Sequence, residues 1–242
     1  MSPDSLAPAT RAELMKLGRL LDVEVDELDY LRDIPAEQLC ALREQVTEVI
    51  FDSGGAALGR LATASRLLPT SAIAAIAERA FGPVLAARIA GLLDAGRAAD
   101  VAAKLPTPFL AEVAVHLDPR RAVDVLARIP AQRIAEVARE LIAAHEHVTL
   151  GRFVGHLPDE ATMLAVRAMD DMTVLLVAFV LEERNAVDRV LALMDGHRVD
   201  GLLDAAIGTE LWPEVLELLH DVREPLRTRV LGSRAVGPAP AG

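Results

Sequence analysis

The sequence predicts an all-α protein, and three observations support this prediction. The chain has 242 residues, 52% of them hydrophobic, and a mean hydropathy of +0.30, a composition typical of a folded protein. Four consecutive blocks of twelve residues repeat one pattern of apolar, capping and acidic positions between Leu93 and Glu140. The candidate hairpin turns, Asp195-Gly196 and Asp200-Gly201, are not flanked by the alternating residues of β-strands.

Each block of twelve residues is typical of one short helix with its own start signal. The second residue of each block is Asp or Pro, the eighth is acidic and the ninth is Val. Aspartate caps free N–H groups at a helix start, and proline fits the first turn because its missing N–H would be unpaired there. The four regular blocks begin at Leu93, Leu105, Leu117 and Ile129, and looser copies begin at Leu68, Phe81, Leu157, Met169, Leu181 and Leu193.

The length of these helices predicts how they pack. A helix of eight or nine residues is too short to be stable alone in water, so each one must bury an apolar face against its neighbours. The sixth, ninth and tenth positions of a block form such a face with the first position of the next block. Antiparallel pairs that repeat every ~24 residues predict a right-handed α-solenoid, or superhelix, over residues 68–231.

The two ends of the chain differ from this repeat. Residues 1–67 predict an N-terminal helical cap, in which Thr10 and Glu13 fit a capping box for the first helix. Residues 232–242 have the Gly, Pro and Ala content of a disordered tail. The helices expected in the cap cover residues 10–21, 25–32, 35–50 and 56–67.

The blocks, written as L-[DP]-x-x-x-A-A-[DE]-V-[AL]-x-x, resemble the cytoplasmic N-terminal superhelical domain of the MgtE magnesium transporters, and the short helical repeats of flagellar FliG-type proteins look similar. The resemblance covers Leu68 to Glu140 well and Leu157 to Asp204 loosely. It implies an α-solenoid that, in the transporter, acts as a regulatory gate and contributes acidic side chains to magnesium sites between domains. No part of this sequence resembles the membrane region or the CBS pair of those transporters, so we expect no transport by this chain.

One acidic residue recurs at the eighth position of every regular block. Clustered carboxylates are the ligands that Mg²⁺ prefers, so these residues are candidate magnesium ligands. Basic residues three positions before or four positions after them are instead typical of helical ion pairs. Antiparallel packing would also place alternate acids on different faces of the solenoid. The four acidic residues are Asp100, Glu112, Asp124 and Glu136.

Other groups of polar residues have similar pairs of interpretations. His145, Glu146 and His147, with His156 nearby, predict either a zinc or iron site or a polar loop between helices. The glycines of residues 151–156 favour close helix contact, because no strand precedes them and no Lys-Ser/Thr follows. Glu217 and His220 lack the second Glu-x-x-His motif that a di-iron site requires, so they predict a solvated helix face. Two groups of arginines predict either attraction of an acidic partner or a solvated helix end: Arg120 and Arg121, and those at 223, 227, 229 and 234.

Composition argues against several classes of partner. A net charge of −11 and an aromatic content of 3% predict no binding to nucleic acid or to anionic lipid. The most apolar stretch, Met172 to Leu181, is about half the length of a membrane helix, so we expect no membrane insertion. No secretory signal opens the chain, which predicts a cytoplasmic location, and arginine far outnumbers lysine, which indicates a bacterial gene. Cys40 is the single cysteine, which excludes an intrachain disulfide.

The sequence therefore predicts a non-catalytic cytoplasmic helical-repeat protein that binds another protein. No catalytic residue can be chosen, because no acid and base pair or activated nucleophile can be assembled. No cofactor is expected, with Mg²⁺ as the one candidate ion. A divalent-cation-sensing domain that acts in trans on another protein is the alternative. A third hypothesis is a small-molecule-binding or enzymatic helical protein, in which the apolar segment Met163 to Val180 lines either the core or a ligand cavity.

Overall fold

The computed structural model describes residues 7–52, 55–181 and 185–207, with single residues at 209, 212, 215, 222, 224 and 228. These parts of the chain consist of helices and turns and contain no strand, so the all-α prediction is confirmed for them. None of the helices within them is both long and apolar enough to cross a membrane.

The first helices form a small unit with a core of its own. Leu14 and Leu17 pack against Leu28 and Leu39, and all four side chains are buried. The unit contains α1 (Pro8–Leu21), the 3-10 helix η2 (Val25–Leu31) and α2 (Ala36–Asp52), and it is followed by α3 (Gly55–Ser65).

The predicted capping box of the first helix is wrong. Helix α1 begins directly after Ala7, with Pro8 at its first position, where the ring favours a helix start. Thr10 therefore lies inside the helix and is buried. Glu13 accepts hydrogen bonds from two basic side chains and has no capping role.

The helices that follow begin at regularly placed Asp and Pro residues. Asp94, Asp170 and Asp195 each accept a hydrogen bond from a backbone N–H in the first turn, at 3.2, 2.7 and 2.8 Å. The prolines lie one position earlier than we expected, because they take the extended N-cap conformation and their carbonyl groups accept the first helical bonds. The N-cap residues from α4 onward include Pro69, Asp94, Pro106, Asp118, Pro130, Pro158, Asp170 and Asp195.

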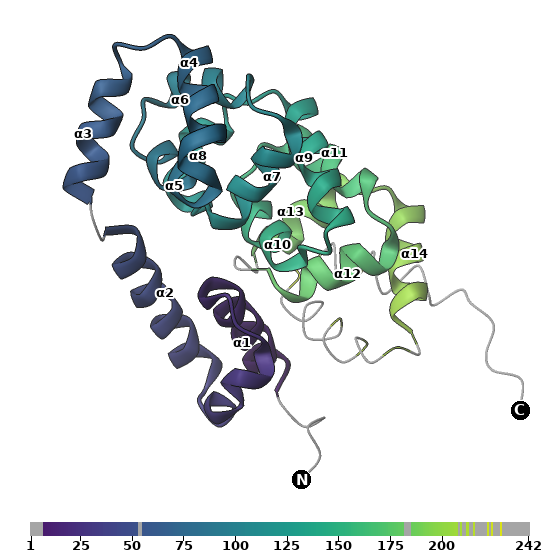
Figure 1. Cartoon of the computed structure of the whole chain (residues 1–242). Helices are drawn as coiled ribbons and strands as arrows, with labels where there is room; N and C mark the ends of the chain where they lie inside the picture. The colour runs from purple at the N-terminus through teal and green to yellow at the C-terminus, as the bar shows by residue number, and fades with distance from the viewer. Residues whose placement is uncertain are drawn as a thin grey trace, which may run out of the picture.

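These helices pack in two rows, which we call the helix stack (Figure 1). In one row α3, α5 (Gly82–Ala90), α7 (Thr107–His116), α9 (Ala131–Ala143), α11 (Asp159–Ala168) and α13 (Asn185–Leu193) contact one another in that order. The other row contains α4 (Thr70–Ile76), α6 (Ala95–Ala102) and α8 (Val123–Leu126), and then α10 (His147–Val154), α12 (Asp171–Phe179) and α14 (Gly196–Ala206). Short segments η3 (Ala77–Phe81, π-helical) and η4 (Pro119–Ala122, 3-10) precede α5 and α8.

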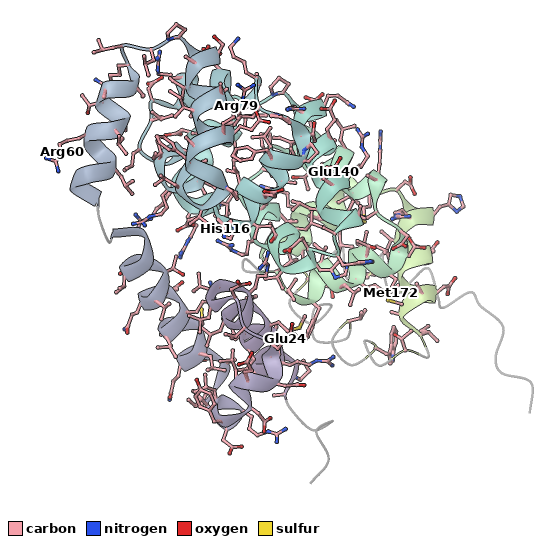
Figure 2. The ribbon with its side chains drawn as sticks, viewed as in Figure 1. Glu24, Arg60, Arg79, His116, Glu140 and Met172 are labelled. Carbon is pink, nitrogen blue, oxygen red and sulfur yellow. The ribbon has the colours of Figure 1, made fainter. Side chains whose placement is uncertain are left out.

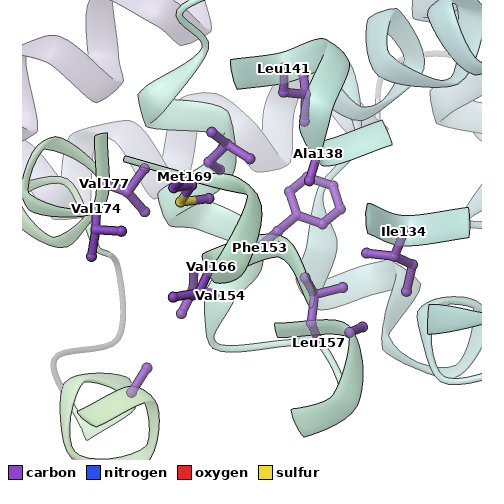
Figure 3. Packing of buried hydrophobic residues seen from close by; sticks show 14 of the residues in the cluster. Ile134, Ala138, Leu141, Phe153, Val154, Leu157, Val166, Met169, Val174 and Val177 are labelled. Carbon is purple, nitrogen blue, oxygen red and sulfur yellow. The ribbon is translucent and has the colours of Figure 1, made fainter. Parts of the chain in front are cut away.

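The interior of the stack contains a small apolar cluster of α4, η3 and α6 and a large one that includes side chains from α5 to α14. Figure 3 shows part of the large cluster, where side chains of α9, α10, α11 and α12 are directed into a shared interior. Gly151 of α10 lies so close to α12 that an added Cβ would be 2.9 Å from Val180 Cγ2 and 3.0 Å from the Val180 carbonyl oxygen. The prediction that this glycine permits close helix contact is confirmed.

The first unit does not extend the row but packs on the middle of the stack. Helix α1 contacts α10, while α2 and α3 lead along one flank to the start of the stack (Figure 1). Arg19 donates to both carboxylate oxygens of Glu146, at 2.7 and 2.9 Å. Lys16 Nζ donates to the Leu181 carbonyl at 3.3 Å. Three parts of the chain that are far apart in sequence therefore meet at this contact.

Candidate functional site

The four predicted magnesium ligands are not gathered into one place. Asp100 and Asp124 lie on helices of one row, and Glu112 and Glu136 lie on helices of the other. The first three side chains are exposed and Glu136 is half-buried, forming a 2.9 Å ion pair with Arg133. Within the described residues no group of three or more His, Cys, Asp or Glu side chains is placed to hold a metal ion. This arrangement supports the helical ion-pair interpretation for Glu136.

The histidines of the predicted loop are likewise not part of a metal-binding group among the described residues. His145 has a positive φ of 57° in the turn after α9, and His147 begins α10. Their rings meet edge to face with centroids 5.9 Å apart. Burial and the neighbouring His145 lower the pKa of His147. Glu217, His220 and the arginines at 223, 227, 229 and 234 lie outside the described residues.

Arginines link successive helices of each row through backbone carbonyl groups. In each case the guanidinium of an arginine on one helix donates to a carbonyl in the turn that precedes the previous helix of the same row. A guanidinium presents several donors in a fixed geometry, so it can satisfy carbonyls that a turn leaves unpaired. The donor and acceptor pairs are Arg97 with Leu68, Arg133 with Leu105, Arg152 with Leu117, Arg189 with Leu157, and Arg198 with Met169.

The arginines before the acidic positions were predicted only as ion-pair partners. Arg133 does pair with Glu136, but Arg97 donates to the carbonyls of Ser65 and Leu68. Arg97 and Arg133 share the fifth position of their blocks, but Arg152, Arg189 and Arg198 do not, so the repeat gave no common signal for these links. These residues hold the stack in register and do not form a reactive site.

The contact between α1 and the stack contains several charged groups. Glu13, Lys16 and Arg43 are all buried, and Glu13 accepts from Lys16 Nζ at 2.7 Å and from Arg43 Nε at 3.0 Å. Burial, followed by the nearby carboxylate of Glu13, raises the pKa of the Cys40 thiol, which makes this single cysteine a weak nucleophile. We interpret these charges as structural, because each makes an interaction inside the protein.

His116 lies at the same contact, where the end of α7 faces α1 (Figure 2). Burial and the positive charge of Arg19 lower the pKa of its imidazole, against smaller opposite effects of Asp22 and Glu146. The neutral form of His116 is therefore favoured in the folded protein. We therefore expect the contact between α1 and the stack to weaken as the pH falls.

A partly open apolar cavity of about 260 Å³ lies inside the stack. Its lining runs from Ile73 of α4 to Leu203 of α14 and continues to Val215, and its only polar lining side chains within the described residues are Arg133 and Thr162. At about 24 cal/mol per Å³, an empty cavity of this size would cost about 6 kcal/mol. A domain has a total stability of about 5–15 kcal/mol, so this cost is large.

The apolar segment from Met163 to Val180 contributes to this cavity in part. Val166, Met169, Val174 and Val177 line it, whereas Met172 is exposed on the surface of α12. The core interpretation of this segment therefore fails at Met172. The four lining residues are buried at the inner faces of α11 and α12 and in the turn between these helices.

Within the stack, exposed apolar side chains are concentrated where it begins; the N-terminal unit exposes Leu21, Tyr30, Leu42 and Val49. Helices α3 and α4 start the two rows, so each has its row neighbour on one side. Leu67, in the turn between them, is 89% exposed. We use the name start-of-stack surface for the exposed apolar residues of α3 to α5 and of the turns that join or directly follow these helices. These residues are Leu61, Leu67, Leu68, Ile76, Val84 and Leu92.

The same part of the chain carries a local positive charge. Residues 55–97 contain five arginines and two acidic residues, in a chain whose net charge is −11. Arg60, Arg66 and Arg79 are exposed among the apolar residues of this surface. This local charge is hidden when charge is counted over the whole chain or in short arginine groups. A count over each predicted helix pair would have found it.

In comparisons with protein-family models, with curated proteins and with solved structures, the chain matches none of them.

Proposed function

We propose that this protein is a non-catalytic helical-repeat protein, with the architecture of an α-solenoid, that binds another protein through its start-of-stack surface. The observation that carries the proposal is the concentration of exposed apolar residues on α3 to α5. Exposed apolar patches with polar surroundings are typical of sites where proteins interact. Within the described residues, the later helices expose far fewer large apolar side chains, with Val123, Met172 and Ile207 as the examples.

The charge of this surface indicates the chemistry of the partner. Arg60, Arg66 and Arg79 give the surface a local positive charge, in a chain whose net charge is −11. A partner with an acidic rim around apolar side chains would be attracted by these arginines and would bury the leucines at the centre. We therefore expect an acidic protein partner.

The test compares two sets of charge-introducing variants. Leu61→Glu, Leu67→Glu and Ile76→Glu, combined in one protein, change the start-of-stack surface. Met172→Glu and Ile207→Glu, combined in a second protein, change exposed apolar residues elsewhere and serve as the matched control. Because all five side chains are exposed, we expect both proteins to fold, which circular dichroism checks.

The measurement is the recovery of bound proteins from lysate of the source organism on each immobilised variant. We expect the control variant to recover a partner protein in a stoichiometric amount. The first variant should recover at least tenfold less of the same protein. Equal recovery on the two variants, or loss from the control alone, would contradict the proposal. Replacing Arg60, Arg66 and Arg79 with Glu should slow association and reduce its dependence on salt.

A further inference from the structure

We propose that the interior cavity of the stack binds an unbranched hydrocarbon chain, such as that of a fatty acid or a fatty alcohol. The cavity has a volume of about 260 Å³ and lies between the two rows of helices. Its site is separate from the start-of-stack surface, so this inference does not depend on the proposed function.

The lining of the cavity selects for an apolar ligand. Among the described residues, leucine, isoleucine, valine, alanine, methionine and phenylalanine side chains provide all of the lining except Arg133 and Thr162. Thr162 Oγ1 bonds with the Pro158 carbonyl at 3.1 Å, and both terminal nitrogens of Arg133 donate to protein acceptors. The polar groups of a polar ligand would find no hydrogen-bond partners inside the cavity. Burial of apolar surface must therefore provide the affinity.

The shape of the cavity favours a chain over a compact molecule. Its lining residues come from successive helices of both rows, from Ile73 of α4 and Ile89 of α5 to Val190 of α13 and Leu203 of α14. The available space therefore extends along the stack. Scaled from a 150 Å³ apolar cavity that holds benzene, this volume accommodates about ten carbon atoms. Because the cavity is partly open, the end group of a longer chain can remain in solvent.

The cost of an empty cavity gives an independent reason to expect an occupant. The lining side chains would lose contact partners over a volume that few folded proteins leave vacant. Ala138 of α9 and Ala165 of α11 are buried alanines on its wall, where larger side chains would fill the space. Small residues at these positions keep the cavity open.

The first experiment measures the affinity of the full chain for saturated acids and alcohols of six to sixteen carbons, by calorimetry below their micelle concentrations. We expect affinity to rise about fourfold with each added methylene up to about ten carbons and then to level off. Tighter binding of acids than of alcohols would identify a carboxylate-bearing ligand near Arg133. Equal affinity for acids and alcohols would show that only the hydrocarbon chain is recognised, and both results support the proposal.

The second experiment fills the cavity with a side chain. Ala138→Leu should weaken decanoic acid binding at least tenfold and leave the melting temperature equal or higher, because the new side chain occupies empty space. Ala135→Leu is the matched control, since Ala135 lies on the same helix, is 4% exposed and is not part of the cavity lining. It should lower the melting temperature by overpacking and leave the affinity for decanoic acid unchanged.

Three results would overturn the proposal. One is the absence of binding by any chain at millimolar concentration. A second is affinity that keeps rising through sixteen carbons, which indicates adsorption to the surface. The third is equal affinity of the folded Ala138→Leu protein and the unmodified protein for decanoic acid.

Discussion

The start of the helix stack and its middle are built from the same kind of short helix, yet they are covered to different extents. In the middle, α9 packs against α7, α10 and α11, and α1 adds a further contact on α10. At the start, α3 and α4 each have a row neighbour on one side. Leu141 of α9 is 5% exposed as a result, whereas Leu67 between α3 and α4 is 89% exposed.

This difference shows how the end of a repeat architecture exposes apolar side chains. Every helix in a stack has an apolar face for the next helix, so the first one needs a polar outer face or another covering element. The N-terminal unit of this chain does not provide that cover, because α1 packs on α10. The apolar and basic start of the stack is therefore left accessible to another protein.

The largest effect should come from removing the buried charge of Glu13, which joins α1 to α2 beside the contact with the stack. Glu13→Gln leaves Lys16 and Arg43 buried without their carboxylate partner, which should lower the free energy of unfolding by about 3–5 kcal/mol. Urea denaturation followed by circular dichroism measures this change. Glu37→Gln, at an exposed position of α2, is the control and should change it by less than about 0.5 kcal/mol. A loss below about 1 kcal/mol for Glu13→Gln would contradict the described role of these charges.

A second prediction compares the same substitution in the two regions. Leu141→Ala removes a buried side chain from the interior of α9 and should cost about 3 kcal/mol. Leu67→Ala removes an exposed one and should change the free energy of unfolding by no more than about 0.5 kcal/mol. Both values come from chemical denaturation of the isolated protein. Comparable losses at the two sites would mean that the start of the stack is covered.

The smallest effect should be a pH dependence confined to the middle of the stack. The pKa values of His116 and His147 are lowered in the folded protein from the usual 6.5, so the unfolded chain binds more protons. The free energy of unfolding should therefore fall as the pH drops below 6.5 and stop falling below the folded pKa values.

Hydrogen exchange at about pH 7 and about pH 5.5 tests where this effect acts. Residues 55–97 contain no histidine, so α1 and α10 should lose protection at the lower pH while α3 to α5 do not. His116→Gln should remove part of the change. Equal loss of protection in both regions would refute the assignment of this pH dependence to the α1 contact.

Some of the fold could be predicted from the sequence because its signals are local. Asp94 and Asp170 were identified as helix starts from capping chemistry alone, and both accept the expected backbone hydrogen bonds. The close approach at Gly151 was also predicted correctly. The start of α1 was misplaced because two capping signals, Pro8 and Thr10, compete within three residues.

Long-range features could not be predicted from these local patterns. The bond from Arg133 of α9 to the Leu105 carbonyl joins that helix to the turn before α7, and nothing in either block specifies the other. The contact of Arg19 with Glu146 depends on where α1 folds back onto the stack. The candidate site was missed for the same reason, since the exposure of Leu67 depends on how the described helices are arranged, none of which covers it, and not on its own block.

The most direct test of the central claim is site-specific photo-crosslinking in lysate of the source organism. A benzophenone amino acid replaces Leu67 in one protein and Met172 in another, and both positions are exposed apolar sites. If the start of the stack is the contact surface, the probe at position 67 will form a discrete adduct with a second protein that the probe at position 172 does not form. An adduct at position 172 alone, or equal adducts at both positions, would contradict the account.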